Sequence, residues 1–318
     1  MRGENCFVSP SRRRFLTLGA GLAASAWAPG WPAEAQAQSA AGAILARPIP
    51  HGNEPLPVVG LGTSGVFDVD GNAAERKSCA EVIKTLVGGG GKLIDTAPSY
   101  GTAEAVVGDL ASETGLTERI FFATKLEEFS PAEAKAELDA SLKRFRRKSI
   151  DLLQLHNVRD PKQDLALLRE WKAHGLCRYI GITTSFRGAF DAIEAVLRRE
   201  KPDFVQLNYS LANREAEKRL LPLAAEVGAA VLTDLPFSRN RLFRAVRGKS
   251  LPEWAKAFEA ASWAQFFLKY LIGNEAVSAV IPGTSNPVHM ADNLGAGRGR
   301  LPDAAERRRM VELIESFG

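Results

Sequence analysis

Eight short apolar runs, separated by longer stretches with helical periodicity, restrict the fold of this chain more than any other feature. They lie at Val58–Thr63, Lys92–Thr96, Ile120–Thr124, Ile150–Leu155, Tyr179–Thr183, Phe204–Asn208, Ala229–Thr233 and Ser278–Ile281. Strands that alternate with helices are typical of β/α units and of a parallel sheet. Eight such units predict an α/β protein with a closed (β/α)8 TIM barrel. An open dinucleotide-binding sheet is disfavoured, because the run Gly60-Leu61-Gly62-Thr63 lacks the third glycine of that fingerprint.

Local signals place further elements around this barrel. Residues Pro131–Arg147 are expected to form a helix, with Ser130 as its N-cap and Pro131 at the first helical position. The segment Ile49–Pro57, with His51-Gly52-Asn53 as its turn, is expected to form a small N-terminal hairpin. Such a hairpin precedes the first barrel strand and is placed to cap the barrel floor.

Composition and charge exclude several classes of protein. With 45% apolar and 25% charged residues, the chain has the composition of a folded globular protein. The formal charge is +4, and residues 1–35 contribute four arginines against two glutamates, so +2 remains without them. This is too little for a nucleic-acid binder. Beyond Cys6, only Cys79 and Cys177 remain, which leaves open at most one disulfide.

The first residues carry the pattern of an export signal. Ser11-Arg12-Arg13-Arg14-Phe15-Leu16-Thr17 precedes the apolar run Leu18–Trp27, which is too short to cross a bilayer. The pattern predicts a twin-arginine leader, the twin-arginine export machinery as a partner, and a periplasmic location. Small residues around Ala35 and Ala37 suit cleavage, so we expect a leader at 1–37, a linker at 38–48 and the barrel at 49–318. An uncleaved amphipathic anchor is disfavoured because the run lacks a polar face, and no later stretch resembles a membrane span.

Ionisable side chains occur at three consecutive strand ends. Asp95 and Tyr100 follow the second strand, Lys125 ends the third and His156 ends the fourth. Strand ends converge at the mouth of a (β/α) barrel, so these groups are expected to face one another. An ammonium beside a phenol favours the phenolate, so Lys125 is expected to lower the pKa of Tyr100 and make it a usable proton donor. Asp95 would keep Lys125 charged, and His156 would orient a substrate carbonyl.

These residues lie in motifs that resemble the aldo-keto reductase family. The run IDTAPSYGTAEAVVG is followed by ATK and LLQLH at the next two strand ends, and the resemblance covers about residues 49–295. It implies reduction of an aldehyde or ketone by hydride transfer from NAD(P)H, with a tyrosine as general acid. It gives the catalytic roles to Asp95, Tyr100, Lys125 and His156. The implied cofactor is NADP, or NAD in its place, and the implied partner is a small carbonyl substrate.

The same resemblance places the nucleotide along the later strand ends. It puts the nicotinamide carboxamide against the fifth and sixth strands, and the loop from Pro236 to Leu242 over the pyrophosphate. After the eighth strand, Asn286 and Pro287 begin a helix whose free N–H groups suit a phosphate. β propensity also explains the threonines, and solvent exposure also explains the arginines. The candidate cofactor residues are Thr183, Thr184, Gln206, Pro236, Ser238, Arg239, Arg241, Gly283, Thr284, Ser285, His289 and Asn293.

Three positions depart from the pattern that the resemblance implies. Gly283 stands where many relatives have lysine, His289 where many have arginine, and Asp234 where many have an aromatic residue beneath the nicotinamide. Imidazole does not offer a phosphate the planar fork of a guanidinium. The preference between NADPH and NADH therefore stays open.

Two other functions are weighed against a reductase. An exported nucleotide-binding sensor or accessory subunit on the same scaffold would tolerate altered cofactor contacts, but it would not need the four catalytic residues. A metal-dependent hydrolase needs clustered ligands, whereas His51, His156, His174 and His289 fall on separate elements. No metal site is expected.

Overall fold

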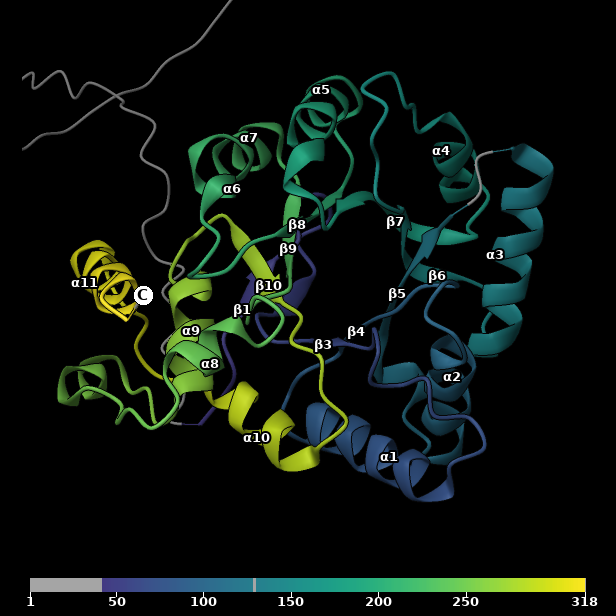
Figure 1. Ribbon diagram of the computed structural model, residues 1–318. Helices are drawn as coiled ribbons and strands as arrows, with labels where there is room; N and C mark the ends of the chain where they lie inside the picture. The colour runs from purple at the N-terminus through teal and green to yellow at the C-terminus, as the bar shows by residue number, and fades with distance from the viewer. Residues whose placement is uncertain (1–41, 128–129, 318) are drawn as a thin grey trace, which may run out of the picture. The chain divides into compact units, whose positions relative to one another are not determined.

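The computed structural model describes residues 42–127 and 130–317, and within them it shows the expected α/β barrel. Eight parallel strands lie in the order β10-β9-β8-β7-β6-β5-β4-β3, so each strand pairs with its neighbour in the sequence. Helices surround these strands (Figure 1). The predicted leader at 1–37 lies outside the described residues.

The strands follow the predicted runs closely. The barrel strands are β3 Leu61–Gly62, β4 Leu93–Asp95, β5 Phe121–Leu126, β6 Ile150–Leu155, β7 Cys177–Thr184, β8 Phe204–Asn208, β9 Ala230–Asp234 and β10 Val277–Val280. The first strand is shorter than predicted, since only two residues pair with β4. Val59, which precedes β3, and Gly62, which ends it, close the barrel through isolated parallel bridges to Val280 and Gly283.

The helices lie outside the ring of strands. They are α1 Ala73–Gly88, α2 Ala103–Glu113, α3 Pro131–Phe145, α4 Ala166–Ala173, α5 Phe190–Glu200, α6 Glu215–Lys218, α7 Leu220–Val227, α8 Arg241–Ala245, α9 Trp263–Ile272, α10 Pro287–Gly295 and α11 Ala304–Glu315. Short 3-10 helices lie at Thr117–Arg119, Arg187–Ala189 and Glu253–Phe258. Ser130 caps α3 by accepting from the backbone N–H of Glu133, as predicted. The helix ends two residues earlier than expected, because Arg146 adopts a left-handed conformation with φ 55°.

The hairpin closes the floor of the barrel. Its strands are β1 Ala46–Pro48 and β2 Pro55–Pro57, so it begins three residues before the predicted start and takes in part of the expected linker. A backbone hydrogen bond of 2.7 Å from Leu45 N–H to Gly297 O ties it to the barrel domain. Ile49 and Leu56 are fully buried among interior residues of the barrel strands. The floor is therefore sealed by apolar side chains.

Alternate residues of each strand point into the barrel. Along β5, Phe121 and Ala123 belong to the apolar interior cluster, and Lys125 follows two residues later. Along β9, Ala230 and Leu232 belong to that cluster and Asp234 follows. The interior thus changes from apolar at the floor to polar at the carboxyl ends of the strands.

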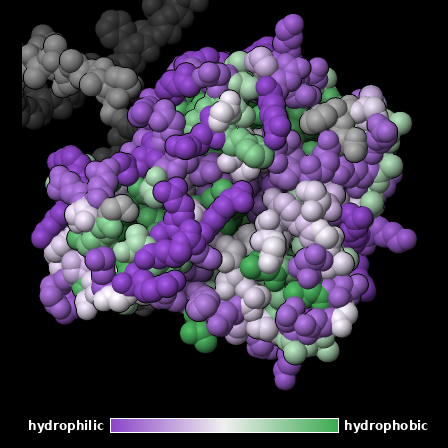
Figure 2. All heavy atoms as spheres, in the orientation of Figure 1, coloured by the Kyte–Doolittle hydropathy of each residue, from purple (hydrophilic) through white to green (hydrophobic). Residues whose placement is uncertain are grey.

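The face of the molecule seen in Figure 1 is mostly hydrophilic. Figure 2 shows polar and charged side chains over most of the face seen in Figure 1. Among the described residues, the exposed large hydrophobic side chains are Phe186 and Val288. No helix in this part of the chain is long and apolar enough to cross a membrane. Cys79 and Cys177 are buried and free, so the two thiols do not form a disulfide.

A buried carboxylate ties α2 to β5 and α3. Glu104, only 1% exposed, accepts hydrogen bonds from Thr124 Oγ1 at 2.5 Å, Ser141 Oγ at 2.9 Å and Arg144 Nη1 at 2.7 Å. A buried charge is tolerated only where its partners satisfy it. These contacts therefore hold two helices in register with the strand that carries Lys125.

Glu104→Ala is expected to lower the free energy of unfolding by about 2–4 kcal/mol, because it leaves two hydroxyls buried without their acceptor. Chemical denaturation followed by circular dichroism measures this change. Glu113→Ala is the control, since it removes an exposed partner of Arg76 and should change stability by about 0.5 kcal/mol or less. Equal losses in the two variants would contradict the role of the buried network.

Candidate active site

A cavity of about 400 Å³ opens at the carboxyl ends of the barrel strands. Its volume lies within the usual range for small-molecule sites. All four residues predicted to be catalytic line it, and they come from the ends of β4, β5 and β6. Its polar wall is formed by Asp95, Tyr100, Lys125, His156, Thr183, Gln206 and Asp234.

Asp95 and Lys125 form a buried ion pair in this wall. Lys125 Nζ donates to Asp95 Oδ2 at 2.7 Å and to the Thr96 carbonyl at 2.7 Å. The side chains of Lys125 and Asp95 are 1% and 3% exposed. Burial alone lowers the pKa of Lys125, but Asp95 and Tyr100 together raise it above its ordinary value. The ammonium therefore stays charged, as the sequence analysis expected.

Tyr100 lies beside this ammonium. Lys125 Nζ is 5.1 Å from the centroid of the Tyr100 ring, and the ring meets the His156 ring edge-on at 5.9 Å. Burial raises the pKa of Tyr100, Lys125 lowers it, and Asp95 and Asp234 raise it again, with a net rise. The expectation that Lys125 brings the pKa of Tyr100 below its usual value is therefore wrong. In the free protein, burial and two carboxylates outweigh one ammonium.

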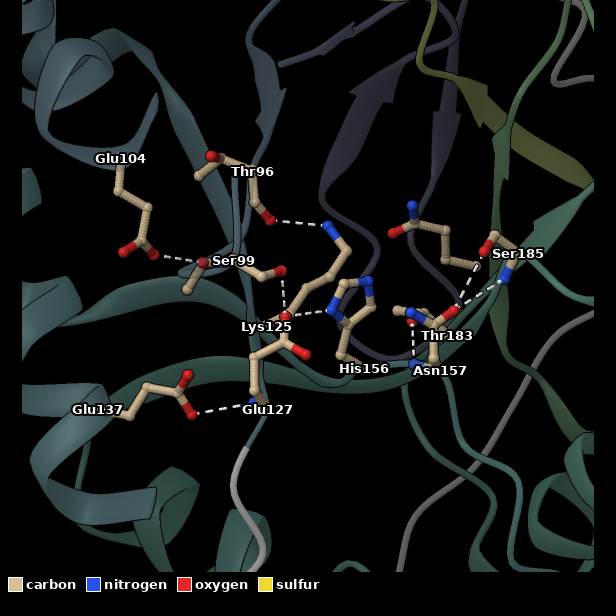
Figure 3. Close-up of polar contacts among 12 residues, drawn as sticks. Thr96, Ser99, Glu104, Lys125, Glu127, Glu137, His156, Asn157, Thr183 and Ser185 are labelled. Atoms are coloured by element: carbon tan, nitrogen blue, oxygen red, sulfur yellow. Dashed lines mark hydrogen bonds and ion pairs between the residues drawn. The ribbon is translucent and has the colours of Figure 1, made fainter. Parts of the chain in front are cut away.

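His156 is held by a carboxylate that the sequence analysis did not single out. Its Nδ1 hydrogen-bonds Glu127 Oε1, the same oxygen that accepts from Ser99 Oγ at 2.5 Å (Figure 3). Burial raises the pKa of Glu127, but His156, Ser99 and Lys125 outweigh it, so the pKa is lowered overall. An ionised carboxylate only accepts hydrogen bonds, so Nδ1 carries the proton. The other ring nitrogen is left for a ligand.

The predicted cofactor residues divide into two groups. Five line the cavity, namely Thr183, Gln206, Pro236, Arg239 and Gly283. The other seven do not line it: Thr184 ends β7, Ser238 and Arg241 follow β9, and Thr284, Ser285, His289 and Asn293 lie after β10 and along α10. Asn286 caps α10 by accepting from the backbone N–H of Val288, so this helix begins where predicted.

Thr184 is the predicted residue that the strand geometry excludes from the cavity. Adjacent residues of a strand point to opposite faces, so Thr183 and Thr184 cannot both face the barrel interior. Thr184 is fully buried, and its hydroxyl accepts from the Phe186 backbone N–H at 3.1 Å. It stabilises the turn after β7 instead of facing a ligand.

A buried acceptor fits a nicotinamide carboxamide. Gln206 Nε2 donates weakly to Asp95 Oδ2 at 3.5 Å, while Gln206 Oε1 is buried and, among the described residues, has no partner. Buried polar atoms without partners are rare in proteins, so this oxygen is placed to accept from a ligand amide. The residues present therefore fit a bound nicotinamide at this wall.

Further polar residues of the wall were not predicted. Asn157 N–H donates to Thr183 Oγ1 at 3.0 Å, and Asn157 Oδ1 accepts from Ser185 N–H at 3.2 Å. Figure 3 shows this chain of contacts beside His156. It joins the loops after β6 and β7, and it fixes Thr183 at the cavity. Such loop contacts carry no periodicity by which the sequence could reveal them.

The described residues hold no metal cluster. Nowhere in residues 42–127 and 130–317 do three His, Cys, Asp or Glu side chains gather in a way that could hold an ion. A closed barrel with a phenol, an ammonium and an imidazole at its mouth is the framework of an enzyme that moves protons.

Comparison with known proteins identifies the class. The sequence profile of the Aldo/keto reductase family matches residues 58–313, and the chain belongs to this family of oxidoreductases. The NADH-specific methylglyoxal reductase of Escherichia coli (strain K12) is 23% identical over 85% of this chain and 99% of its own. Aldo-keto reductase YhdN of Bacillus subtilis (strain 168) is 29% identical, but the match spans 53% of this chain and 54% of YhdN.

Solved structures share the fold. An aldo/keto reductase from Klebsiella pneumoniae, crystallised with NADP and acetate, superposes with a TM-score of 0.67 at 23% identity, over 82% of this chain and 93% of its own. The holo form of an aldo-keto reductase from Bacillus halodurans gives 0.66 at 22% identity, over 85% and 96%.

Glu127→Gln is expected to let His156 populate both neutral tautomers, because a carboxamide can donate a hydrogen bond as well as accept one. In the parent protein the proton should sit on Nδ1, whereas the variant should show both tautomers, with turnover reduced by about tenfold. Nitrogen-15 NMR of the histidine ring measures the populations.

Glu133→Gln is the matched control for this change, because Glu133 lies at the exposed start of α3 and contacts Ser130. It should leave the His156 signals unchanged. Identical tautomer populations in the parent protein and Glu127→Gln would remove the role assigned to Glu127.

Proposed function

We propose that this protein reduces the carbonyl group of a small aldehyde or ketone with a nicotinamide cofactor, and that Tyr100 is the general acid. The observation that carries this proposal is the convergence of Asp95, Tyr100, Lys125 and His156 on one cavity. Membership of the aldo/keto reductase family supports it. The methylglyoxal reductase named among the relatives supports a small carbonyl substrate.

Tyr100 holds the proton that the carbonyl oxygen takes up. Its raised pKa keeps the phenol protonated at neutral pH. Proton transfer to the substrate oxygen leaves a phenolate, which the Lys125 ammonium stabilises. Asp95 keeps that ammonium charged, and His156 orients the carbonyl through its free ring nitrogen. When bound, the reduced nicotinamide supplies the hydride.

We assign NADP as the cofactor, or NAD in its place. The Klebsiella pneumoniae structure contains NADP, whereas the Escherichia coli relative is named as specific for NADH. Gly283 and His289 offer no fixed cation to a 2′-phosphate, and Arg239 is the guanidinium that lines the cavity. At the start of α10, Asn286 already accepts from the N–H of Val288, so a phosphate would compete with this cap for the N–H groups of the first turn.

Tyr100→Phe is expected to lower kcat/KM for an aromatic aldehyde by at least about 100-fold, because the ring stays but the proton is lost. Nucleotide affinity should stay within about twofold. Absorbance of NAD(P)H measures turnover, and fluorescence titration measures binding. Tyr179→Phe is the control, because Tyr179 contacts Glu54 at the barrel floor.

Two results would overturn the reductase assignment. Turnover by Tyr100→Phe equal to that of the parent protein would remove Tyr100 as the acid. A parent protein that binds nucleotide but turns over no member of an aldehyde and quinone panel would favour the sensor or accessory subunit.

We further propose that residues 1–37 form a twin-arginine leader and that the barrel works in the periplasm. The run from Ser11 to Thr17 supports this proposal. By resemblance, the twin-arginine route carries folded proteins, so a cofactor loaded in the cytoplasm would travel with the barrel.

Replacing both Arg12 and Arg13 by lysine is expected to keep the protein unprocessed in the cytoplasmic fraction, since the adjacent arginines form the recognised signal. Cell fractionation and mass spectrometry of the N-terminus measure the outcome. Arg2→Lys is the control, because Arg2 lies outside the motif. Continued export and cleavage of the double variant would refute the leader.

A further inference from the structure

Asp234 is an acidic residue of the cavity that the reaction above does not use. It ends β9, and it lines the cavity together with Tyr100 and Lys125. Its Oδ1 is buried and, within the described part of the chain, has no hydrogen-bond partner. A buried carboxylate oxygen without a donor is costly, so a ligand that compensates it would gain affinity.

The charges around Asp234 do not neutralise it. Lys125 on β5 is already paired with Asp95 on β4 at 2.7 Å. Arg239, on the loop after β9, is exposed to solvent and therefore screened. The neighbouring strands bring no charge, since β8 places the amide Asn208 opposite Asp234 and β10 ends in apolar residues. With Asp234 ionised, the carboxylates of Asp95 and Asp234 face the Lys125 ammonium, and the titratable rings of Tyr100 and His156 line the same cavity.

Asp234 titrates in the physiological range. Burial and the nearby Asp95 raise its pKa to about 7, while Lys125 and Arg239 lower it in part. The charge of the cavity therefore changes near neutral pH. A bound cation would hold Asp234 in its ionised form, and a neutral ligand would not.

The nicotinamide ring changes charge in the reaction. The oxidised ring carries one positive charge, and the reduced ring is neutral. Hydride transfer requires the ring to touch the carbonyl carbon whose oxygen meets Tyr100. The ring therefore enters the cavity that Asp234 lines, and its charge interacts with that carboxylate in a partly desolvated site.

We propose that Asp234 makes the cavity select the oxidised nucleotide over the reduced one. This inference rests on the proposed function, because it requires a nicotinamide in the cavity. The Asp234 carboxylate attracts the cationic ring and gains nothing from the neutral ring. The protein therefore retains NAD(P)+ after reduction, and in the bound state the equilibrium favours hydride transfer from the reduced nucleotide to the carbonyl.

The sign of the pH dependence follows from this attraction. Binding of the cationic ring lowers the pKa of Asp234, so affinity for the oxidised form rises as pH increases through about 7. Binding of the neutral ring buries the carboxylate further, so affinity for the reduced form stays level or falls. The ratio of the two dissociation constants removes the titration of the 2′-phosphate, because both redox forms carry that group.

The experiment measures Kd for NADP+ and for NADPH by calorimetry on the full barrel between about pH 6 and 8.5, the range around the pKa of Asp234. The parent protein, Asp234→Asn and Asp139→Asn are compared. Asp139 is the matched control, since it is exposed on α3, pairs with Lys135 and does not line the cavity. Thermal melting of each variant shows whether the barrel remains folded.

In the parent protein and in Asp139→Asn, we expect the ratio Kd(NADPH)/Kd(NADP+) to rise by about tenfold or more across this range. In Asp234→Asn the ratio should not vary with pH, NADP+ should bind more weakly, and the affinity for NADPH should change little. A ratio in the parent protein that does not vary with pH overturns the inference, and this result needs no variant. If both nucleotides bind and Asp234→Asn leaves the ratio of their dissociation constants unchanged, this inference alone is overturned. If the parent protein binds neither nucleotide, the proposed function is overturned as well.

Discussion

The Asp95–Lys125 ion pair is the interaction on which the rest of the site depends. An ammonium that is 1% exposed keeps its proton chiefly because a carboxylate lies 2.7 Å away on the neighbouring strand. That charge stabilises the phenolate that Tyr100 becomes when it gives up its proton. Because Lys125 is paired with Asp95, it compensates the second acid of the cavity, Asp234, only in part.

The barrel puts these charges at one end by simple alternation. Side chains two residues apart on a strand share a face, so the inward-facing residues of β5 and β9 are apolar at the floor and polar at the mouth. The hairpin seals the apolar floor with Ile49 and Leu56. Water and ligands therefore reach the polar end, where desolvation is partial and the groups can titrate.

Patterns local to a strand predicted much of this arrangement. The eight strands, the cap of α3 and the meeting of Asp95, Tyr100, Lys125 and His156 follow from periodicity and from the positions of strand ends. Thr184 does not line the cavity, because adjacent residues of β7 point to opposite faces and Thr183 faces the interior. Glu127 was missed because its contact with His156 depends on how two loops approach each other, and no spacing encodes that approach.

The sequence by itself determined the family, the barrel and the four groups at its mouth, because strand periodicity and residue order are properties of the chain. Only the tertiary structure decided the electrostatics. The pKa of Tyr100 rises, where the sequence had suggested a fall, because burial and two carboxylates from other strands act on it together. Likewise, the Oδ1 of Asp234, which has no partner among the described residues, is enclosed only once β4, β5 and β9 are assembled around one cavity. Burial and the distances between strands set these energies, and both depend on how the folded chain is assembled.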